Sequence, residues 1–230
     1  AHPALINAAT AQLALGSAFG LPTESEVDLA ELLVSRLPSV EQVRFANSGT
    51  EAVMMALKAA RAHTGRPRIA KCEGAYHGSY DYAEVSLDPV PDAWGRNAPV
   101  SVAYAKGTPD NVLADVVTIP FNDTEAAVSL IREHGEGLAC VLVDPMPNRA
   151  GLAPADQSYL EALRKVTQEV GALLIFDEVI TFRLGFRGAQ GIWNIDPDLT
   201  TLGKIIGGGF PVGAIGGRRD VMAVFDPRPG

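Results

Sequence analysis

The sequence alternates short, wholly apolar runs with longer segments in which apolar side chains recur every three or four residues. The runs at residues 138–143 and 172–176 are apolar throughout, and each lies between a glycine and an aspartate. Strands that are apolar on every residue are buried on both faces, which is typical of parallel sheets covered by helices. The sequence therefore predicts an α/β fold with a mainly parallel central sheet and helices on both faces.

The remaining pattern places further strands and helices along the chain. Residues 84–110 contain four prolines and no clear period, which predicts a long irregular segment of the kind found around active sites. Strands are predicted at residues 42–46, 69–72, 116–120, 138–143, 172–176, 199–202 and 212–215. Helices are predicted after the capping boxes Thr23-Glu-Ser-Glu26 and Ser48-Gly-Thr-Glu51, and at residues 122–134, 156–170 and 218–225.

Composition narrows the class of protein. Of 230 residues, 47 % are hydrophobic and 20 % charged, so a packed core is expected, and the formal net charge is −8. The acidic balance without a basic stripe argues against nucleic-acid partners, and no apolar run reaches bilayer length. Cys72 and Cys140 lie in strand-like runs and are predicted to be buried thiols, as in a cytoplasmic protein. The four histidines lack metal-ligand spacing, so no metal site is expected.

Two residues indicate a particular chemistry. Lys204 lies between Leu202-Gly203 and Ile205-Ile206, and this apolar frame predicts a buried lysine, which is costly unless the amine is neutral or used covalently. Asp177 follows an apolar strand, and Asp144 and the stretch Asn47-Ser-Gly-Thr50 also follow predicted strands. We expect all of them to meet at one edge of the sheet, where ligands bind. A lysine that forms a Schiff base and an acid that holds a pyridinium nitrogen are the groups that pyridoxal 5'-phosphate (PLP) requires. The simpler interpretations are a surface lysine at a turn and an acid that caps the next turn.

Other segments complete this hypothesis. Ser48, Gly49 and Thr50 open a predicted helix, whose N-terminus suits a phosphate, although capping alone would explain them. Tyr76 follows a strand beside His77, and its ring could stack on a flat cofactor or pack on the domain.

Nucleotide-binding patterns are absent. The glycines at 207–209 do not extend to GxGxxG, because position 212 is valine. Gly203-Lys204 lacks both the upstream glycine and the following Ser or Thr of a P-loop. The sequence therefore favours PLP over a nicotinamide or nucleotide.

Four ordered stretches resemble the class III aminotransferases, which are PLP enzymes of fold type I. The similarity runs from about residue 20 to residue 226. It implies an aspartate-aminotransferase-like, PLP-binding large domain at residues 23–226, a lead-in segment at 1–22, and the start of a connection to a C-terminal domain at 227–230. We therefore expect a part of a longer, homodimeric enzyme. The matching stretches are Asn47-Ser-Gly-Thr-Glu-Ala52, Glu73-Gly-Ala-Tyr-His-Gly78, Phe176-Asp-Glu-Val179 and Leu199-Thr-Thr-Leu-Gly-Lys-Ile-Ile-Gly-Gly-Gly209.

The resemblance also implies a role for each matching residue. Lys204 would form the Schiff base and move the proton, and Asp177 would pair with the pyridine nitrogen. Tyr76 and Val179 would cover the two faces of the ring, with His77 in support. The phosphate would be held by Ser48, Gly49 and Thr50.

The activity that the resemblance implies has two main alternatives. Pro211-Val-Gly-Ala214 and Gly188-Ala-Gln-Gly191 resemble glutamate-1-semialdehyde aminomutases, which serve porphyrin biosynthesis, and related transaminases. The stretch Thr181-Phe-Arg183 lacks a glycine that aminomutases carry, and β-amino-acid transaminases are similarly shortened. Asp144 stands where relatives usually have glutamate. A β- or ω-amino-acid transaminase and a non-catalytic PLP-holding homologue therefore remain open, with a small amino acid or amino aldehyde as the substrate.

Overall fold

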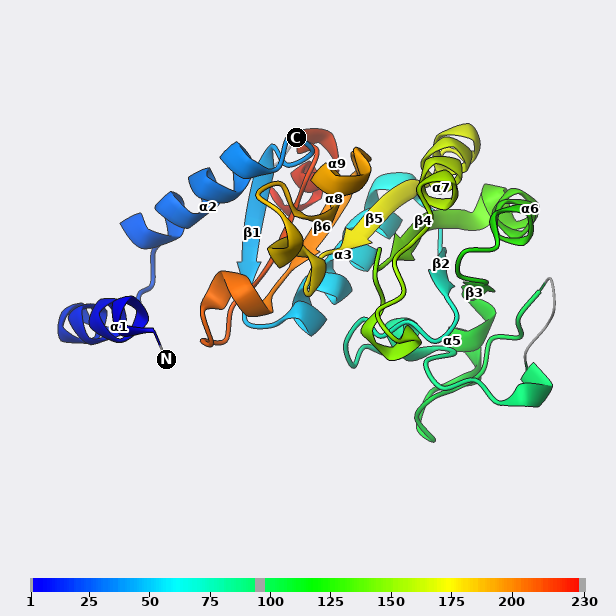
Figure 1. Ribbon diagram of the computed structural model, residues 1–230, viewed down its shortest axis with the longest axis horizontal. Helices are drawn as coiled ribbons and strands as arrows, with labels where there is room; N and C mark the ends of the chain where they lie inside the picture. The colour runs from blue at the N-terminus through cyan, green and yellow to red at the C-terminus, as the bar shows by residue number, and fades with distance from the viewer. Residues whose placement is uncertain (1, 94–97, 228–230) are drawn as a thin grey trace.

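The computed structural model describes residues 2–93 and 98–227, which contain one seven-stranded sheet covered by helices on both faces (Figure 1). Its strand order is β1-β7-β6-β5-β4-β2-β3, and all strands except β7 run in the same direction. The mainly parallel sheet predicted from the sequence is thus confirmed. The strands are β1 (Gln42–Ala46), β2 (Arg68–Cys72), β3 (Val116–Ile119), β4 (Leu138–Val143), β5 (Leu173–Asp177), β6 (Leu199–Leu202) and β7 (Gly213–Gly217).

The helices of the described residues differ widely in length, from single turns to sixteen residues. Two single-turn 3-10 helices, η4 (Thr181–Leu184) and η5 (Lys204–Gly207), follow β5 and β6. The α-helices are α1 (Pro3–Leu15), α2 (Glu24–Arg36), α3 (Gly49–Thr64), α4 (Asp81–Glu84), α5 (Asp110–Ala114), α6 (Thr124–His134), α7 (Gln157–Val170), α8 (Gly188–Trp193) and α9 (Arg219–Met222).

The central strands are apolar because each contributes to two separate cores. In β5, Leu174 and Phe176 belong to a cluster with the apolar faces of α6 and α7. The intervening residues Leu173 and Ile175 belong to a second cluster, with the apolar face of α3. All four side chains are at most 5 % exposed, so no position of this strand could be polar without a partner. The predicted thiols Cys72 and Cys140 are also buried, one in each cluster.

The capping signals had different outcomes in the two predicted helices. At α3, the Ser48 hydroxyl accepts a hydrogen bond from the Glu51 amide (3.1 Å), and Gly65 ends the helix with a φ of 69°. The Glu51 carboxylate accepts from the Asn47 amide (2.6 Å), one residue before the N-cap. At α2, Thr23 occupies the N-cap position but its side chain makes no capping bond, so the predicted capping box was wrong there.

Some of the structure was not predicted. Helix α1, which has no buried residue and stands apart from the sheet beside α2, was not predicted (Figure 1). The short α8 was not predicted either. Residues 94–97 of the predicted irregular segment and 228–230 of the predicted connection lie outside the described residues. Within the described part of the chain, no helix is long and apolar enough to cross a membrane.

Candidate active site

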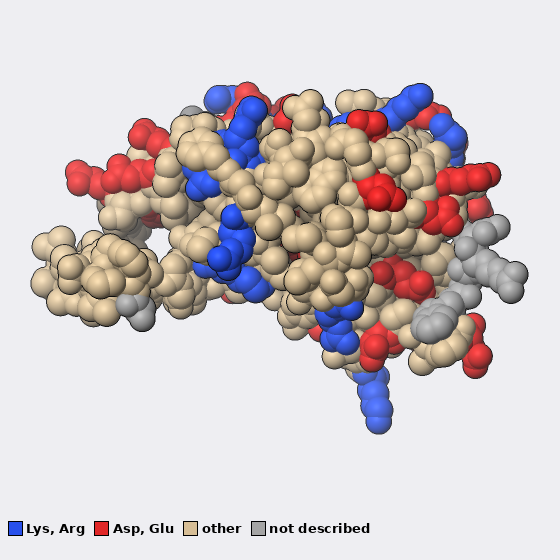
Figure 2. All heavy atoms as spheres, viewed as in Figure 1, with Lys and Arg blue, Asp and Glu red and all other residues tan. Residues whose placement is uncertain are grey.

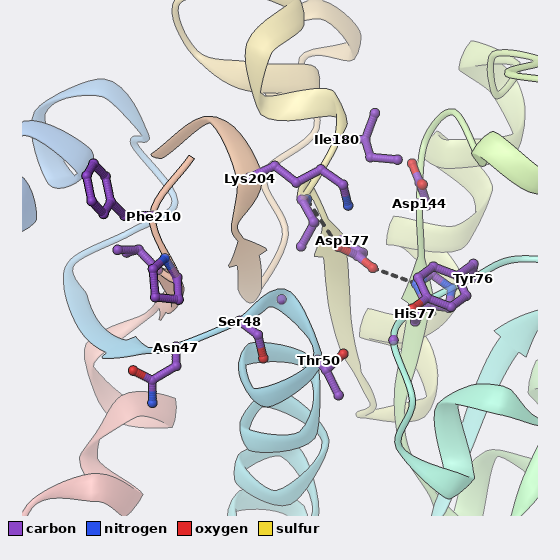
Figure 3. A pocket seen from close by; sticks show the side chains of 15 residues that line it. Asn47, Ser48, Thr50, Tyr76, His77, Asp144, Asp177, Ile180, Lys204 and Phe210 are labelled. Carbon is purple, nitrogen blue, oxygen red and sulfur yellow. Dashed lines mark hydrogen bonds and ion pairs between the residues drawn. The ribbon is translucent and has the colours of Figure 1, made fainter. Parts of the chain in front are cut away.

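A pocket of about 260 Å³ lies at the carboxyl edge of the parallel strands. The segments that follow β1, β2, β4, β5 and β6 line it, together with the turn that precedes β7. All eight residues predicted for the site face this one pocket, although they come from four separate stretches of the chain (Figure 3). They are Ser48, Gly49, Thr50, Tyr76, His77, Asp177, Val179 and Lys204.

One end of the pocket is the N-terminus of α3. Gly49 and Thr50 belong to its first turn, where backbone N–H groups have no acceptor inside the helix and the helix dipole favours an anion. The side chains of Ser48 and Thr50 rise from the same turn, beside the open space of the pocket (Figure 3). This end can therefore hold a phosphate by amides, hydroxyls and the dipole together.

Glycines allow the backbone segments around this end to come very close. A Cβ on Gly49 would lie 2.8 Å from Val179 Cγ2, and a Cβ on Gly78 would lie 2.8 Å from the Thr50 Cα. Gly78 also has a φ of 89°, which a larger residue rarely adopts. The wall of the pocket is thus tightly packed at these two positions, and a side chain at either glycine would displace its neighbours.

The other end is organised by Asp177, the last residue of β5. Its carboxylate is 4 % exposed. One oxygen, Oδ1, accepts hydrogen bonds from the Val179 amide (3.1 Å) and the Thr201 hydroxyl (3.0 Å). The other oxygen, Oδ2, lies 2.7 Å from His77 Nδ1. These contacts fix the carboxylate in one orientation, toward the space that Lys204 also faces (Figure 3).

His77 is buried against this carboxylate. Burial lowers the pKa of His77, while its hydrogen bond to Asp177 acts in the opposite direction. A neutral imidazole here donates its Nδ1 proton to Asp177, which leaves the lone pair on Nε2. Nε2 is buried and has no partner among the described residues. His77 therefore holds the Asp177 side chain in place through a buried hydrogen bond.

Lys204 differs from the expectation. It is exposed, not buried, so the prediction of an enclosed lysine was wrong for this chain. The apolar neighbour Ile205 is itself 50 % exposed, so it does not bury the lysine. The Lys204 backbone has a φ of 44°, and its side chain extends from η5 into the pocket toward Asp177 (Figure 3).

Asp144 is a second buried acid in the pocket. It follows β4, is 4 % exposed, and accepts a hydrogen bond from the Met146 amide (2.9 Å). Burial raises its pKa from 3.8 to about 7, and the neighbouring Asp177 acts in the same direction. The pocket thus contains, beside Asp177, a second acid whose pKa lies close to neutral pH.

Glu178 fixes the segment behind the pocket. Its buried carboxylate accepts hydrogen bonds from the Gln190 amide (3.1 Å) and from Gln190 Nε2 (2.8 Å). It also accepts from the Ala189 amide, so it caps the N-terminus of α8. Burial raises the pKa of Glu178, and these donors oppose the rise. The residue next to Asp177 therefore anchors α8 and the η4 segment between them.

The donor set fits PLP. A phosphate arm matches the free amides and hydroxyls at the start of α3, and a protonated ring nitrogen matches the hydrogen-bonded Asp177 carboxylate. Lys204 supplies a primary amine between the two ends. The exposed ring of Tyr76 (37 % exposed) and the side chain of Val179 also line the pocket.

Several lining residues were not assigned to the site from the sequence. Asn47 and Asp144 were predicted to lie on the same rim, because each follows a strand, but neither was given a role. Ile180 lies next to a predicted residue. Phe210 and Pro211 lie in the turn before β7, and no local signal marked them. The remaining lining residues that were not predicted are Gly78 and Val212.

Known proteins resemble the chain over nearly its whole length. Residues 1–229 match the model of a family described as Aminotransferase class-III. Glutamate-1-semialdehyde 2,1-aminomutase of Methanothermobacter thermautotrophicus is 47 % identical over 228 residues, which are 99 % of this chain and 52 % of that protein. The crystal structure of an omega-transaminase from Sphaerobacter thermophilus is 55 % identical with a TM-score of 0.94, covering 99 % of this chain and 52 % of that one.

A transaminase solved with PLP bound is 48 % identical with a TM-score of 0.92, covering 100 % of this chain and 53 % of that one. The chain thus spans about half the length of the relatives that it matches. The family match, the sheet order and the grouping of the four sequence stretches around one pocket agree, and the chain belongs to the class III aminotransferase family.

Proposed function

We propose that this chain forms the cofactor-binding part of a PLP-dependent amino-transfer enzyme. The observation that carries the proposal is that Lys204 and Asp177, from the ends of two neighbouring strands, face one pocket whose far end is the N-terminus of α3. An amine, a fixed carboxylate and a phosphate-binding helix end are the protein groups that this chemistry needs.

Each residue has a definite task in this proposal. PLP, when bound, stores the electron pair that is left when a bond at the α-carbon of an amine breaks. Lys204 Nζ would hold the cofactor through its amine and, when free, would take and return the α-carbon proton. The Asp177 carboxylate holds a proton on the ring nitrogen, and His77 keeps that carboxylate in place. Tyr76 and Val179 cover the two faces of the ring.

Amino transfer between two molecules is the first form of the activity, and intramolecular transfer is the second. The 55 % identity to an omega-transaminase favours the first, and the 47 % identity to an aminomutase favours the second. The two differ in stoichiometry, because an aminomutase converts one substrate without a second amino acceptor. Product analysis with a single amino aldehyde and without any acceptor distinguishes them. A non-catalytic homologue would form no product, either with or without an amino acceptor.

Borohydride reduction tests the proposal. The protein, produced with its native flanking sequence and loaded with PLP, is reduced, digested and analysed by mass spectrometry. We expect the cofactor on the peptide that contains Lys204, and no label after Lys204→Ala. Lys58→Ala, at an exposed position of α3, is the control and should leave the label unchanged. A label on another lysine would refute the assignment.

We also propose that the native protein is a homodimer. The support is α1, whose Leu13 and Leu15 are 69 % and 77 % exposed. This helix carries no charged residue, and Figure 2 shows its surface free of acidic and basic side chains. An apolar helix surface of this kind is normally buried against another protein surface.

A further inference from the structure

A second cavity, of about 650 Å³, adjoins the pocket at Lys204. Val179, Ile180 and Lys204 line both spaces, so the Lys204 side chain stands at the boundary between them. Beyond it, the second cavity extends between α1 and the loop after β6. Leu5 of α1 closes that side, since a Cβ on Gly208 would lie 2.7 Å from Leu5 Cδ2.

The lining of this cavity is apolar apart from two cations. Its apolar side chains are those of Leu5, Val179, Ile180 and Ile205, and Gly208 and Gly209 complete the lining. The charged residues are Lys204 and Arg183, and none of the described residues that line the cavity is acidic. A substrate whose amine reacts at Lys204 therefore meets hydrocarbon walls and a single remaining positive charge.

The backbone that carries Arg183 is held firmly. The Phe182 amide donates to the Glu178 carbonyl (3.1 Å), and the Phe182 side chain is 3 % exposed. The Arg36 guanidinium lies over the Phe182 ring, 4.5 Å from its centroid, and Arg36 Nε donates to the Phe186 carbonyl (2.7 Å). Arg183 thus projects from a fixed turn, although its own side chain is exposed.

The Arg183 guanidinium is free to bind a ligand. It has no hydrogen bond or ion pair with any described residue, unlike Arg36, Arg164 or Arg218. A guanidinium is a fork of donors that matches a carboxylate in a bidentate pair, and apolar surroundings strengthen that pair. We therefore expect the unpaired Arg183 guanidinium to bind an anionic group of the substrate.

We propose that Arg183 binds the carboxylate of the amino donor, and that the donor is a monocarboxylic amino acid with a hydrocarbon body. This rests on the proposed amino-transfer function. The amine reaches Lys204, the carboxylate pairs with Arg183, and the hydrocarbon lies against Leu5, Ile180 and Ile205. A second carboxylate would find no further cation among the described residues that line the cavity.

Two matched donors test the proposal in the PLP-loaded protein with its native flanking sequence. They are 3-aminobutanoate and 2-aminobutane, which differ in having a carboxylate or a methyl group at the same place. Arg183→Gln should lower kcat/KM for 3-aminobutanoate by about 10- to 100-fold, mainly through KM, because a charge-assisted pair is lost. It should leave 2-aminobutane unchanged. Arg183→Lys keeps the charge but not the forked arrangement of donors. Its kcat/KM for 3-aminobutanoate should lie between those of the wild type and Arg183→Gln.

Arg187 provides the matched control. It is an exposed arginine on the same segment and does not line the cavity, so Arg187→Gln should leave both donors unchanged. Binding of butanoate, measured by calorimetry without any turnover, should weaken in Arg183→Gln and not in Arg187→Gln. Equal loss for both donors, or equal butanoate affinity in both variants, would overturn the role of Arg183.

These outcomes are separable from failure of the proposed function. If Lys204 took no borohydride label and neither amine reacted, the amino-transfer function would fail, and butanoate binding would still decide whether Arg183 is a carboxylate site. If both amines reacted and Arg183→Gln did not discriminate between them, only the carboxylate assignment would fail.

Discussion

At Lys204 the backbone adopts a conformation that only glycine adopts freely. Its φ of 44° costs a lysine about 1 kcal/mol, and the residue directly before it is the extended Gly203. Such outliers cluster at functional sites, where the surrounding structure maintains them. Here the left-handed turn starts η5 and directs the amine into the pocket, so the strain serves to aim one side chain.

The carboxylate of Asp177 should matter for turnover more than for cofactor binding. In Asp177→Asn the amide can still accept from the Val179 amide and the Thr201 hydroxyl, so the local fold should persist. The substitution removes the charge that is proposed to hold the ring-nitrogen proton. We expect PLP absorbance to remain detectable and turnover to fall by about 100-fold or more. Asp156→Asn, at an exposed site, is the control; near-normal turnover in Asp177→Asn would contradict the assigned role.

Asp144 should make stability depend on pH. Between pH 3.8 and about 7 the folded chain keeps a proton on this carboxyl that the unfolded chain has released. Its contribution to stability therefore falls as pH rises through that window and is lowest above it. We expect Asp144→Asn to match the wild type near pH 4 and to exceed it at pH 8 by on the order of 2–4 kcal/mol.

Urea unfolding of the cofactor-free protein at three pH values, in buffer without phosphate, measures this difference. The asparagine Oδ1 can still accept from the Met146 amide, so the comparison isolates the charge. A difference between the two proteins that does not change with pH would show that burial does not hold Asp144 protonated.

At the scale of elements, the pocket depends on how closely β7 approaches the start of α3. A Cβ on Gly213 would lie 2.1 Å from the Ser48 carbonyl oxygen and 2.5 Å from its carbon. Both atoms are backbone, so neither can move aside cheaply. We expect Gly213→Ala to destabilise the fold by about 1–3 kcal/mol and to weaken PLP binding, because the turn that is proposed to bind the phosphate must shift.

Gly107→Ala is the matched control, since nothing lies within 4 Å of a Cβ at Gly107. Denaturant unfolding and PLP titration of the two variants give the comparison. If Gly213→Ala behaved like Gly107→Ala in both measurements, the close approach would not constrain the site.

Elements were predictable from the sequence where a local pattern determines them. The runs at β4 and β5 are apolar because both faces are covered, and α3 begins and ends at residues whose side chain or φ is local information. The direction of β7 was not predictable, because it follows from where the chain returns to the sheet. The exposure of Lys204 was not predictable either, because its apolar neighbours suggested an enclosure that the described residues do not form.

The site shows the same division. The strand-end position of Asp177 could be read from the sequence, and the resemblance to a family supplied roles for its neighbours. The hydrogen bond between His77 and Asp177 joins residues one hundred positions apart, and no spacing rule gives it. Arg183 and Leu5 line one cavity only because η4 and α1 meet beside Lys204. Contacts between distant segments thus required the structure.

At the scale of the whole molecule, charge and apolar surface are unevenly placed. The face in Figure 2 shows acidic side chains along α2, while the neighbouring α1 shows none of either sign. An isolated helix of thirteen residues is marginal in water, and α1 buries no residue. Its helical form therefore implies contact with further protein, which the homodimer would supply.

A protein comprising residues 1–230 should accordingly self-associate through α1. Size-exclusion chromatography with light scattering should show species larger than 24.2 kDa, and Leu13→Lys with Leu15→Lys should shift them toward the monomer. Val90→Lys with Val100→Lys is the control, because these side chains are similarly exposed (57 % and 58 %) and distant in sequence from α1. Lysines on the apolar helix would be desolvated in the interface, whereas those of the control would remain in water. A monodisperse wild-type monomer whose α1 amides are protected from hydrogen exchange would contradict this, since it would show that α1 needs no cover.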